Sequence, residues 1–237
     1  MRAYPDHYFV LNKNITISGQ WVPIEVFNGY LNGNHKSIHN LTNTFIVTNN
    51  GTISNLNLKD VNINDFRLLH IGSLSKFNYG RLTHINVSGE IYGYEDMAGL
   101  TYYNNGLIEG ATINMNVRSN RFAGGIADIN GPEGVIKKSF FNGKVSNSGG
   151  AGGIVYDNRG LIKDSIARGS VSIECCIAGG IAGDNSGVIM NVIAAADVHF
   201  TQDSKTIGKV AGYNMSNGQI IRPIVLNHIY KNGVLVE

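Results

Sequence analysis

The stretch Gly179–Gly187, "GGIAGDNSG", decides how the whole chain is interpreted. It is rich in glycine and carries a single charge, so it fits neither a helix nor a charged catalytic centre. Related stretches occur at Gly152–Gly160 ("GGIVYDNRG") and at Ala98–Gly106 ("AGLTYYNNG"). A motif that returns along a chain indicates a repeat protein, in which each copy is one structural unit.

The repeat is defined by three sets of residues that keep fixed offsets. The glycine that ends each copy recurs after 29, 26, 28, 26, 27 and 31 residues, at Gly51, Gly80, Gly106, Gly134, Gly160, Gly187 and Gly218. Two positions after the glycine stands an apolar residue: Ile53, Leu82, Ile108, Ile136, Ile162, Ile189 and Ile220. Four positions after the Gly-Gly-Ile anchor of six copies stands an asparagine: Asn78, Asn104, Asn130, Asn158, Asn185 and Asn214.

Apolar residues between the glycines alternate over short stretches, and no stretch has the i, i+3, i+4, i+7 spacing of a helix. Short strands with a period of about 27 residues are typical of a parallel β-solenoid with one repeat per coil. We therefore predict an all-β parallel β-helix with 26–31 residues per coil and about eight coils. The apolar positions should form an inward ladder, and the asparagines a buried column that hydrogen-bonds from coil to coil.

The first 32 residues precede the regular repeat. An open solenoid end exposes unpaired strand edges, so we predict that residues 1–32 form an N-terminal cap with lead-in strands. Residues 33–237 are then the coils of one continuous domain.

Composition excludes several classes of function. The net charge of +2 and a charged fraction of 15% do not favour a nucleic acid as partner. No 18-residue apolar run and no apolar leader are present, so we expect neither a membrane span nor a signal peptide in this stretch. Adjacent cysteines rarely form a bridge, so Cys175 and Cys176 are interpreted as packing thiols. We expect no cofactor.

The stretch "AGGIAGDNSGVIMNVIAAADV" (Ala178–Val198) resembles the GLUG repeat of bacterial surface and secreted proteins. The copies at Ala151–Val171 and Ala98–Val117 match it more loosely, and Ile15–Thr42 resembles the lead-in that often precedes such repeats. The resemblance implies a right-handed parallel β-helix and an extracellular or cell-surface location. Such repeats occur in adhesin-like proteins and beside the catalytic part of metallopeptidases that cleave immunoglobulin A. The H-E-x-x-H motif of those enzymes is absent here, so the resemblance implies at most an accessory domain.

Two acidic residues are the strongest candidates for catalysis. Asp157 and Asp184 precede the repeat asparagine in successive copies, which would place their backbones about 4.8 Å apart. Carboxylates about 5 Å apart suit a retaining glycosidase, and three or more could hold calcium. An exposed turn is the alternative interpretation of the pair. His35 and His39 would lie about 13 Å apart on a strand, so we expect no metal site there.

Binding is predicted at the loops that vary in length between the ladder valine and the Gly-Gly block, because partners contact variable loops on a constant scaffold. The aromatic and basic residues of these loops are Tyr92, Tyr94, Arg118, Arg121, Phe122 and Phe200. A host glycan or a protein surface would be the partner, and the chain could be part of a longer protein or assembly.

The sequence therefore predicts a non-catalytic module of a bacterial surface or secreted protein, acting in adhesion or as a rigid spacer. The alternatives are a carbohydrate-active β-helix, such as a polysaccharide hydrolase, a lyase or a phage tail spike, and an accessory domain of a larger secreted protease. No cluster of Asp, Arg and Lys is expected on one side, so we predict no hydrolase or lyase activity.

Overall fold

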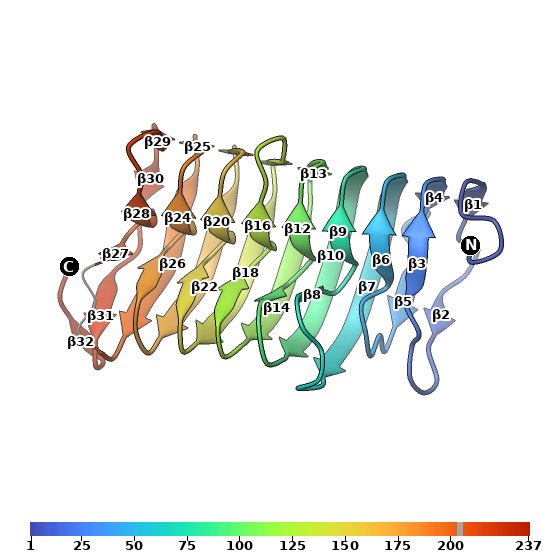
Figure 1. Ribbon diagram of the computed structural model, residues 1–237, viewed down its shortest axis with the longest axis horizontal. Coiled ribbons are helices and arrows are strands. Elements are labelled where there is room, and N and C mark those ends of the chain that lie inside the picture. The colour runs from blue at the N-terminus through green and yellow to red at the C-terminus, as the bar shows by residue number, and fades with distance from the viewer. Residues whose placement is uncertain (203–205) are drawn as a thin grey trace.

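The computed structural model describes residues 1–202 and 206–237 and shows a solenoid. Its strands stack along one long axis, with the two chain termini at opposite ends (Figure 1). Within the described residues every regular element is a strand, and all but one of the strand pairings are parallel. The predicted parallel β-solenoid is thereby confirmed.

Sheet B runs the length of the solenoid and contains one strand from each of eight coils. Its strands are β3 (Ile24–Phe27), β6 (Ile46–Asn49), β9 (Ser75–Asn78), β12 (Thr101–Asn104), β16 (Ala127–Asn130), β20 (Val155–Asn158), β24 (Ala182–Asn185) and β28 (Ala211–Asn214). The shorter sheet C has six strands, each of which precedes a strand of sheet B in the chain. They are β8 (Ile71–Gly72), β11 (Met97–Ala98), β15 (Phe122–Gly124), β19 (Gly150–Gly152), β23 (Ile177–Gly179) and β27 (Thr206–Gly208).

Sheet A has 18 strands and forms the remaining wall. Its strands are β1 (Tyr8–Val10), β2 (Ile15–Thr16), β4 (Tyr30–Asn32), β5 (Ser37–His39), β7 (Thr52–Asn64), β10 (Arg81–Tyr92), β13 (Leu107–Glu109), β14 (Thr112–Arg118), β17 (Val135–Lys137), β18 (Phe140–Asn147), β21 (Leu161–Lys163), β22 (Ile166–Ile173), β25 (Val188–Met190), β26 (Ile193–Phe200), β29 (Gln219–Ile221), β30 (Ile224–Val225), β31 (Ile229–Lys231) and β32 (Val234–Leu235). Parallel stacking begins inside the first 32 residues, because β1 pairs with β4 and β3 pairs with β6. At the other end β31 and β32 form an antiparallel hairpin.

The core is built from columns of equivalent side chains. The residues two positions after the turn glycines pair in register and are 0% exposed at Leu82, Ile108, Ile136, Ile162 and Ile189. Each of these side chains packs on the same position of the next coil, so burial repeats along the axis.

A column of asparagines runs beside this ladder. Five of the six repeat asparagines donate from the side-chain amide to the asparagine of the next coil at 2.6–2.9 Å; the donors are Asn78, Asn104, Asn130, Asn158 and Asn185, and the last acceptor is Asn214. All but the last are fully buried, and Asn214 is exposed at the C-terminal end. The column also includes Asn49, which donates to Asn78 at 2.8 Å and lies one coil before the six that the sequence pattern singled out.

Sheet A bends at a column of left-handed residues, four positions after each turn glycine. Their φ angles lie between 48° and 64°, at Asn55, His84, Gly110, Lys138, Asp164, Asn191 and Arg222. The turn glycines have a different role, since a Cβ at Gly160 would collide with the carbonyl oxygen of Gly134 on the preceding coil. Glycine is needed there for the close approach of two backbones.

The two cysteines differ from the prediction, because Cys175 and Cys176 form a disulfide rather than packing as thiols. Cys176 has a positive φ of 84°, a backbone conformation that non-glycine residues rarely adopt.

Among the described residues, the structure contains no helix that is long and apolar enough to cross a membrane.

Candidate binding face

The outer surface of sheet B positions the candidate site. In β9, β12 and β20 the first and last residues are buried and the two middle residues are partly exposed, whereas in β16 and β24 only the third residue is partly exposed. Two columns result from the stacking of these strands. The residues at the third strand position pair in register and are Phe77, Tyr103, Ile129, Asp157 and Asp184. The second strand position holds Lys76, Tyr102, Asp128, Tyr156 and Gly183. These columns, with the sheet C residues that contact them, are called the binding face below.

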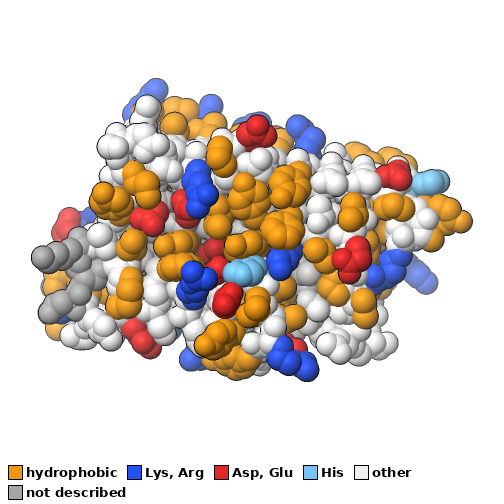
Figure 2. All heavy atoms as spheres, viewed as in Figure 1, with side chains coloured by type: hydrophobic (Ala, Val, Ile, Leu, Met, Phe, Trp, Pro, Cys, Tyr) orange, Lys and Arg blue, Asp and Glu red, His pale blue; other side chains and the backbone are white. Residues whose placement is uncertain are grey.

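Aromatic rings occupy one end of the binding face. The ring centroids of Phe77 and Tyr103 lie 6.5 Å apart, and those of Tyr79 and Tyr103 lie 6.1 Å apart. Tyr102 packs edge-on against Phe77 at 6.1 Å. Tyr79 is 50% exposed, so this cluster offers ring surface to the solvent. Figure 2 shows hydrophobic side chains gathered near the middle of this view, with charged groups and a histidine below them.

A second aromatic pair lies two coils further along. The rings of Phe122 and Tyr156 stack at 4.1 Å with an interplanar angle of 5°. The guanidinium of Arg121 lies 4.9 Å from the Phe122 ring and 4.0 Å from the carboxylate of Asp96. Arg121 and Phe122, predicted as loop residues, therefore belong to the binding face together with Tyr156.

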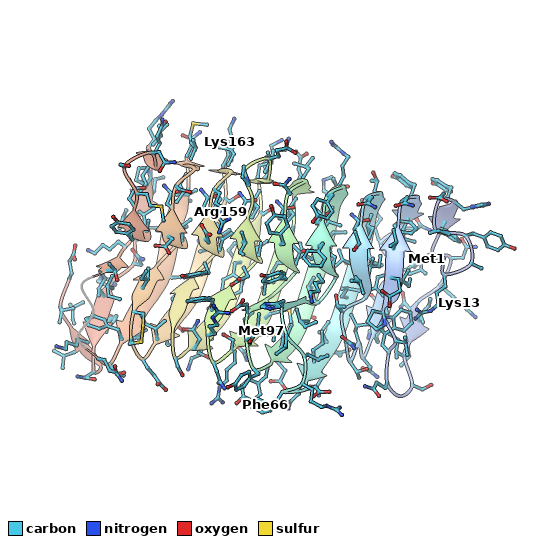
Figure 3. The ribbon with its side chains drawn as sticks, in the orientation of Figure 1. Met1, Lys13, Phe66, Met97, Arg159 and Lys163 are labelled. Carbon is cyan, nitrogen blue, oxygen red and sulfur yellow. A yellow bond between two sulfur atoms is a disulfide. The ribbon has the colours of Figure 1, made fainter. Side chains whose placement is uncertain are left out.

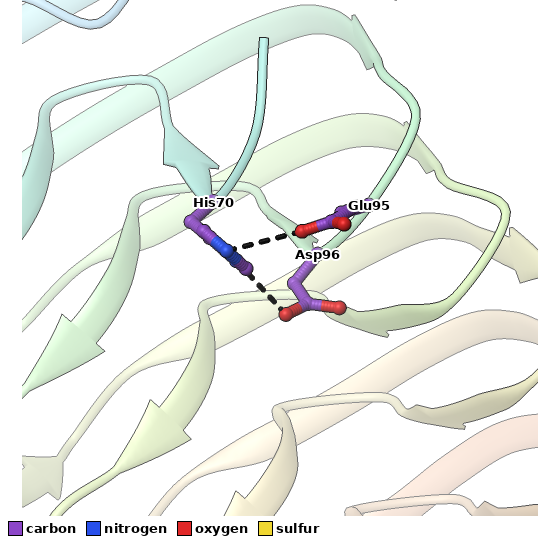
Figure 4. A group of neighbouring side chains, drawn as sticks. All are labelled: His70, Glu95 and Asp96. Carbon is purple, nitrogen blue, oxygen red and sulfur yellow. Dashed lines mark hydrogen bonds and ion pairs between the residues drawn. The ribbon is translucent and has the colours of Figure 1, made fainter.

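His70, Glu95 and Asp96 converge at the beginning of sheet C (Figure 4). The Nδ1 atom of His70 lies 2.9 Å from Oδ2 of Asp96, and its Nε2 atom lies 3.1 Å from Oε2 of Glu95. The imidazole also packs on the Tyr102 ring at 4.8 Å. One potential ligand atom from each of the three residues lies within 4.8 Å of the others.

Asp128 is buried between the two aromatic groups. It is 1% exposed, and within the described structure neither carboxylate oxygen has a hydrogen-bond partner. Burial raises the pKa of Asp128 well above its ordinary value, and the charges of Asp96 and Asp157 raise it further. Burial and the same acidic surroundings raise the pKa of Tyr102 to about 12.

The candidate acids Asp157 and Asp184 are register partners on β20 and β24. Asp157 accepts hydrogen bonds from Arg159 at 2.6 and 2.7 Å. Figure 3 shows Arg159 over the strands of sheet B. Asp184 interacts with the Tyr156 hydroxyl instead, and burial raises its pKa. The two carboxylates are therefore neighbours with different partners.

The remaining predicted binding residues lie elsewhere. Tyr92 contacts Phe66 at 4.5 Å and Arg118 at 4.7 Å, at the loop edge where Figure 3 labels Phe66. Tyr94 is 54% exposed, whereas Phe200 is only 9% exposed and packs with the core. His39 lies 2.9 Å from Asp60, and neither His39 nor His35 belongs to the three-residue group at His70.

The expectation that no side gathers acidic and basic residues is wrong. Asp96, Asp128, Asp157, Arg121 and Arg159 lie on one face because the register aligns strands from neighbouring coils. The position of Asp128 and of the two tyrosines beside it could have been recognised from the repeat pattern. Tyr102, Asp128 and Tyr156 all stand two residues after the apolar anchor, a position that the repeat pattern leaves variable.

No protein-family model matches the chain, and no curated protein is similar to it in sequence. The solved structures that share its fold include two at 19% identity. One is an IgA1 protease, matched with a TM-score of 0.64 over 87% of this chain and 20% of that protein. The other is a candidate immunoglobulin A1 protease from Bacteroides ovatus, solved at 1.30 Å and matched with a TM-score of 0.63 over 100% of this chain and 75% of that one. The chain thus spans about a fifth of the first protease, and the likeness extends to the β-solenoid fold.

Proposed function

We propose that the chain is a rigid, non-catalytic β-solenoid module of a secreted or cell-surface bacterial protein, and that it binds a glycan through the binding face. The observation that carries the proposal is the placement of exposed rings beside carboxylates and guanidinium groups on consecutive coils. The apolar faces of sugar rings pack on aromatic side chains, and their hydroxyl groups bind to charged side chains.

The surroundings of the acids favour binding over catalysis. Asp128 is covered, so a substrate oxygen has no direct path to its carboxylate. The guanidinium of Arg159 contacts Oδ2 of Asp157 at 2.6 and 2.7 Å and so occupies one of its carboxylate oxygens. A pair of carboxylates that cleaves a glycosidic bond needs one accessible acid and one accessible base or nucleophile.

The test is a glycan array followed by titration calorimetry of the glycans that bind. Tyr103→Ala should weaken binding about 10-fold or more, because it removes the ring at the centre of the aromatic cluster. Tyr213→Ala is the matched control, since Tyr213 occupies the same outward column on β28 and is 50% exposed. Tyr94→Ala distinguishes the binding face from the variable loops. If it weakens glycan binding more than Tyr103→Ala does, the glycan binds at the variable loops.

Two results would overturn the proposal. One is equal loss of binding in Tyr103→Ala and Tyr213→Ala, or no glycan binding by the folded protein. The other is release of reducing ends or unsaturated sugars from a polysaccharide, abolished by Asp157→Asn or Asp184→Asn. That outcome would establish the carbohydrate-active alternative.

A second role is supported by the likeness to IgA1 proteases. The module would then be an accessory domain of a larger secreted protease, holding the substrate or spacing the catalytic part. Deleting the module from such a full-length protein should lower cleavage of the intact substrate and leave cleavage of a short peptide unchanged. Equal loss for both substrates would contradict an accessory role.

A further inference from the structure

The group formed by His70, Glu95 and Asp96 has a chemistry of its own, independent of glycan binding. The residues come from two adjacent coils, with His70 just before β8 and the two acids just before β11. Because Met97 pairs with Ile71, the sheet register places Asp96 directly opposite His70. The group is therefore fixed by two stacked strands rather than by one flexible loop.

The imidazole is placed between two acceptors. Nδ1 lies 2.9 Å from one carboxylate oxygen and Nε2 lies 3.1 Å from another. A neutral imidazole carries one N–H, so it can donate to only one of these carboxylates. The Nδ1 contact with Asp96 is a hydrogen bond, whereas Nε2 lies near the Glu95 carboxylate without a hydrogen bond to it, so a second proton or a metal cation at Nε2 would be stabilised by that carboxylate.

Among the described residues, Asp96 keeps one carboxylate oxygen without a hydrogen bond, although His70 and Arg121 lie near its other oxygen. The side chain of Asp96 is 6% exposed, and its Oδ1 has no hydrogen-bond partner within the described structure. Asp128 is as deeply buried and also unpartnered, and Asp96 is the charge that acts on it most strongly. The guanidinium of Arg121 remains 4.0 Å from Asp96, beyond hydrogen-bond distance. Buried carboxylates are normally paired with a cation or bound to a metal.

We propose that His70, Glu95 and Asp96 bind a divalent transition metal, of which Zn²⁺ fits best. One imidazole nitrogen with carboxylate oxygens is a donor set that suits Zn²⁺, whereas Ca²⁺ takes oxygen ligands alone. Ligand atoms around a tetrahedral zinc ion lie about 3.3 Å apart, from bonds of about 2.0–2.1 Å. The 2.9 and 3.1 Å contacts of His70 come from opposite nitrogens of its ring, so a metal ion would bind one nitrogen, and the carboxylate that now contacts the other nitrogen would have to turn toward the ion; one potential ligand atom from each residue already lies within 4.8 Å of the others.

Three protein ligands leave a fourth position for water or for an oxygen atom of a bound molecule. Tyr102 packs on the imidazole from the sheet B side, so the metal would lie at the border of the binding face. The remaining carboxylate oxygens and Asp128 would supply the negative surroundings that favour a cation over a neutral ligand.

The proposal is tested with untagged protein, freed of metal by a chelator and titrated with Zn²⁺ in a calorimeter. We expect one site per chain, whose affinity falls about 10-fold or more in His70→Ala and in Glu95→Gln. The matched control is His39→Ala, because His39 has the same 2.9 Å contact with a carboxylate and lies outside the group.

A spectroscopic readout separates coordination from a general structural effect. Co²⁺ bound at this site should give visible d–d absorption in the wild type and in His39→Ala, and the bands should be lost in His70→Ala. Circular dichroism of each variant verifies that it is folded. Absence of saturable Zn²⁺ binding in the wild type, or binding that His39→Ala weakens as much as His70→Ala, would overturn the proposal. Neither result depends on whether the protein binds a glycan.

Discussion

Asn158 donates a hydrogen bond from its side-chain amide to Oδ1 of Asn185, one coil further along, at a distance of 2.7 Å. It also accepts a bond at 2.9 Å from Asn130 on the preceding coil. Because all three side chains are fully buried, the column satisfies polar groups that water cannot reach.

The asparagine column can be tested at one of its central members. Asn158→Ala should lower the free energy of unfolding by about 1–3 kcal/mol, because Oδ1 of Asn185 loses its donor and the side-chain amide of Asn130 loses one of its acceptors. A urea titration measures this loss. The control is Asn214→Ala, at the exposed end of the column, which should cost less. Similar costs at the two positions would contradict a role for burial.

The apolar ladder gives a second prediction. Ile162 is 0% exposed and lies between Ile136 and Ile189 in register, so truncation creates a cavity that the stacked coils cannot close. Ile162→Ala should cost about 2–5 kcal/mol in the same titration. Ile220→Ala, on the last coil and only partly buried, should cost less. A near-neutral effect of Ile162→Ala would mean that the ladder does not stabilise the core.

The column of left-handed residues at which sheet A bends predicts opposite effects on stability when either of two neighbouring lysines is replaced by glycine. Lys138 has a φ of 49°, whereas Lys137 ends strand β17. Lys138→Gly should be neutral or stabilising by up to about 1 kcal/mol, because glycine adopts this conformation without a steric penalty. Lys137→Gly should destabilise by about 1 kcal/mol through loss of strand propensity. Thermal unfolding of both variants measures the difference. An equal loss of stability in the two variants would contradict a left-handed conformation at Lys138.

Asp128 predicts how stability depends on pH. Its pKa is raised in the folded state above the ordinary value of 3.8, so the folded protein binds more protons than the unfolded chain once the pH exceeds that value. Ionisation of Asp128 therefore destabilises the fold as the pH rises from about 4 through the raised pKa. Asp128→Asn should increase the free energy of unfolding at pH 7 by about 1–3 kcal/mol.

The gain from Asp128→Asn should shrink as the pH falls toward 4, because the wild-type carboxyl is then protonated in both states. Denaturant titrations at several pH values, in the presence of a chelator, test this trend. The control is Asp164→Asn at an exposed corner, for which we expect no comparable change. A gain that is independent of pH would exclude ionisation as its cause.

The β-solenoid could be predicted from the sequence because residues that point into the core pack against equivalent residues in every coil. Ile108 and Ile136 pack against equivalent residues, so one spacing rule describes both, and the repeat asparagines follow the same logic. The candidate Asp157–Asp184 pair was found for this reason, since it occupies one repeat position.

The rest of the binding face could not be derived in this way. Positions outside the core ladders need not repeat, so Tyr102, Asp128 and Tyr156 differ in chemistry although they share one strand position, the second of β12, β16 and β20. The meeting of His70 with Asp96 depends on the register of short strands after loops of different length. Likewise, the bridge between Cys175 and Cys176 joins neighbouring residues, one of which has a positive φ, and the repeat spacing does not determine this local backbone conformation.

The asparagine column also gives the solenoid a polarity along its axis. Every side-chain amide donates toward the C-terminal coil, so the aligned dipoles add, as peptide dipoles do in a helix. At the negative end Asn49 keeps an Oδ1 without a partner, because its register neighbour Phe27 has no donor in its side chain. At the positive end Asn214 donates to the carbonyl oxygen of Gly218. The chain of amides would extend past Asn49 only if the Phe27 position offered a side-chain donor, and a coil stacked on Asn214 would extend it only by offering an acceptor.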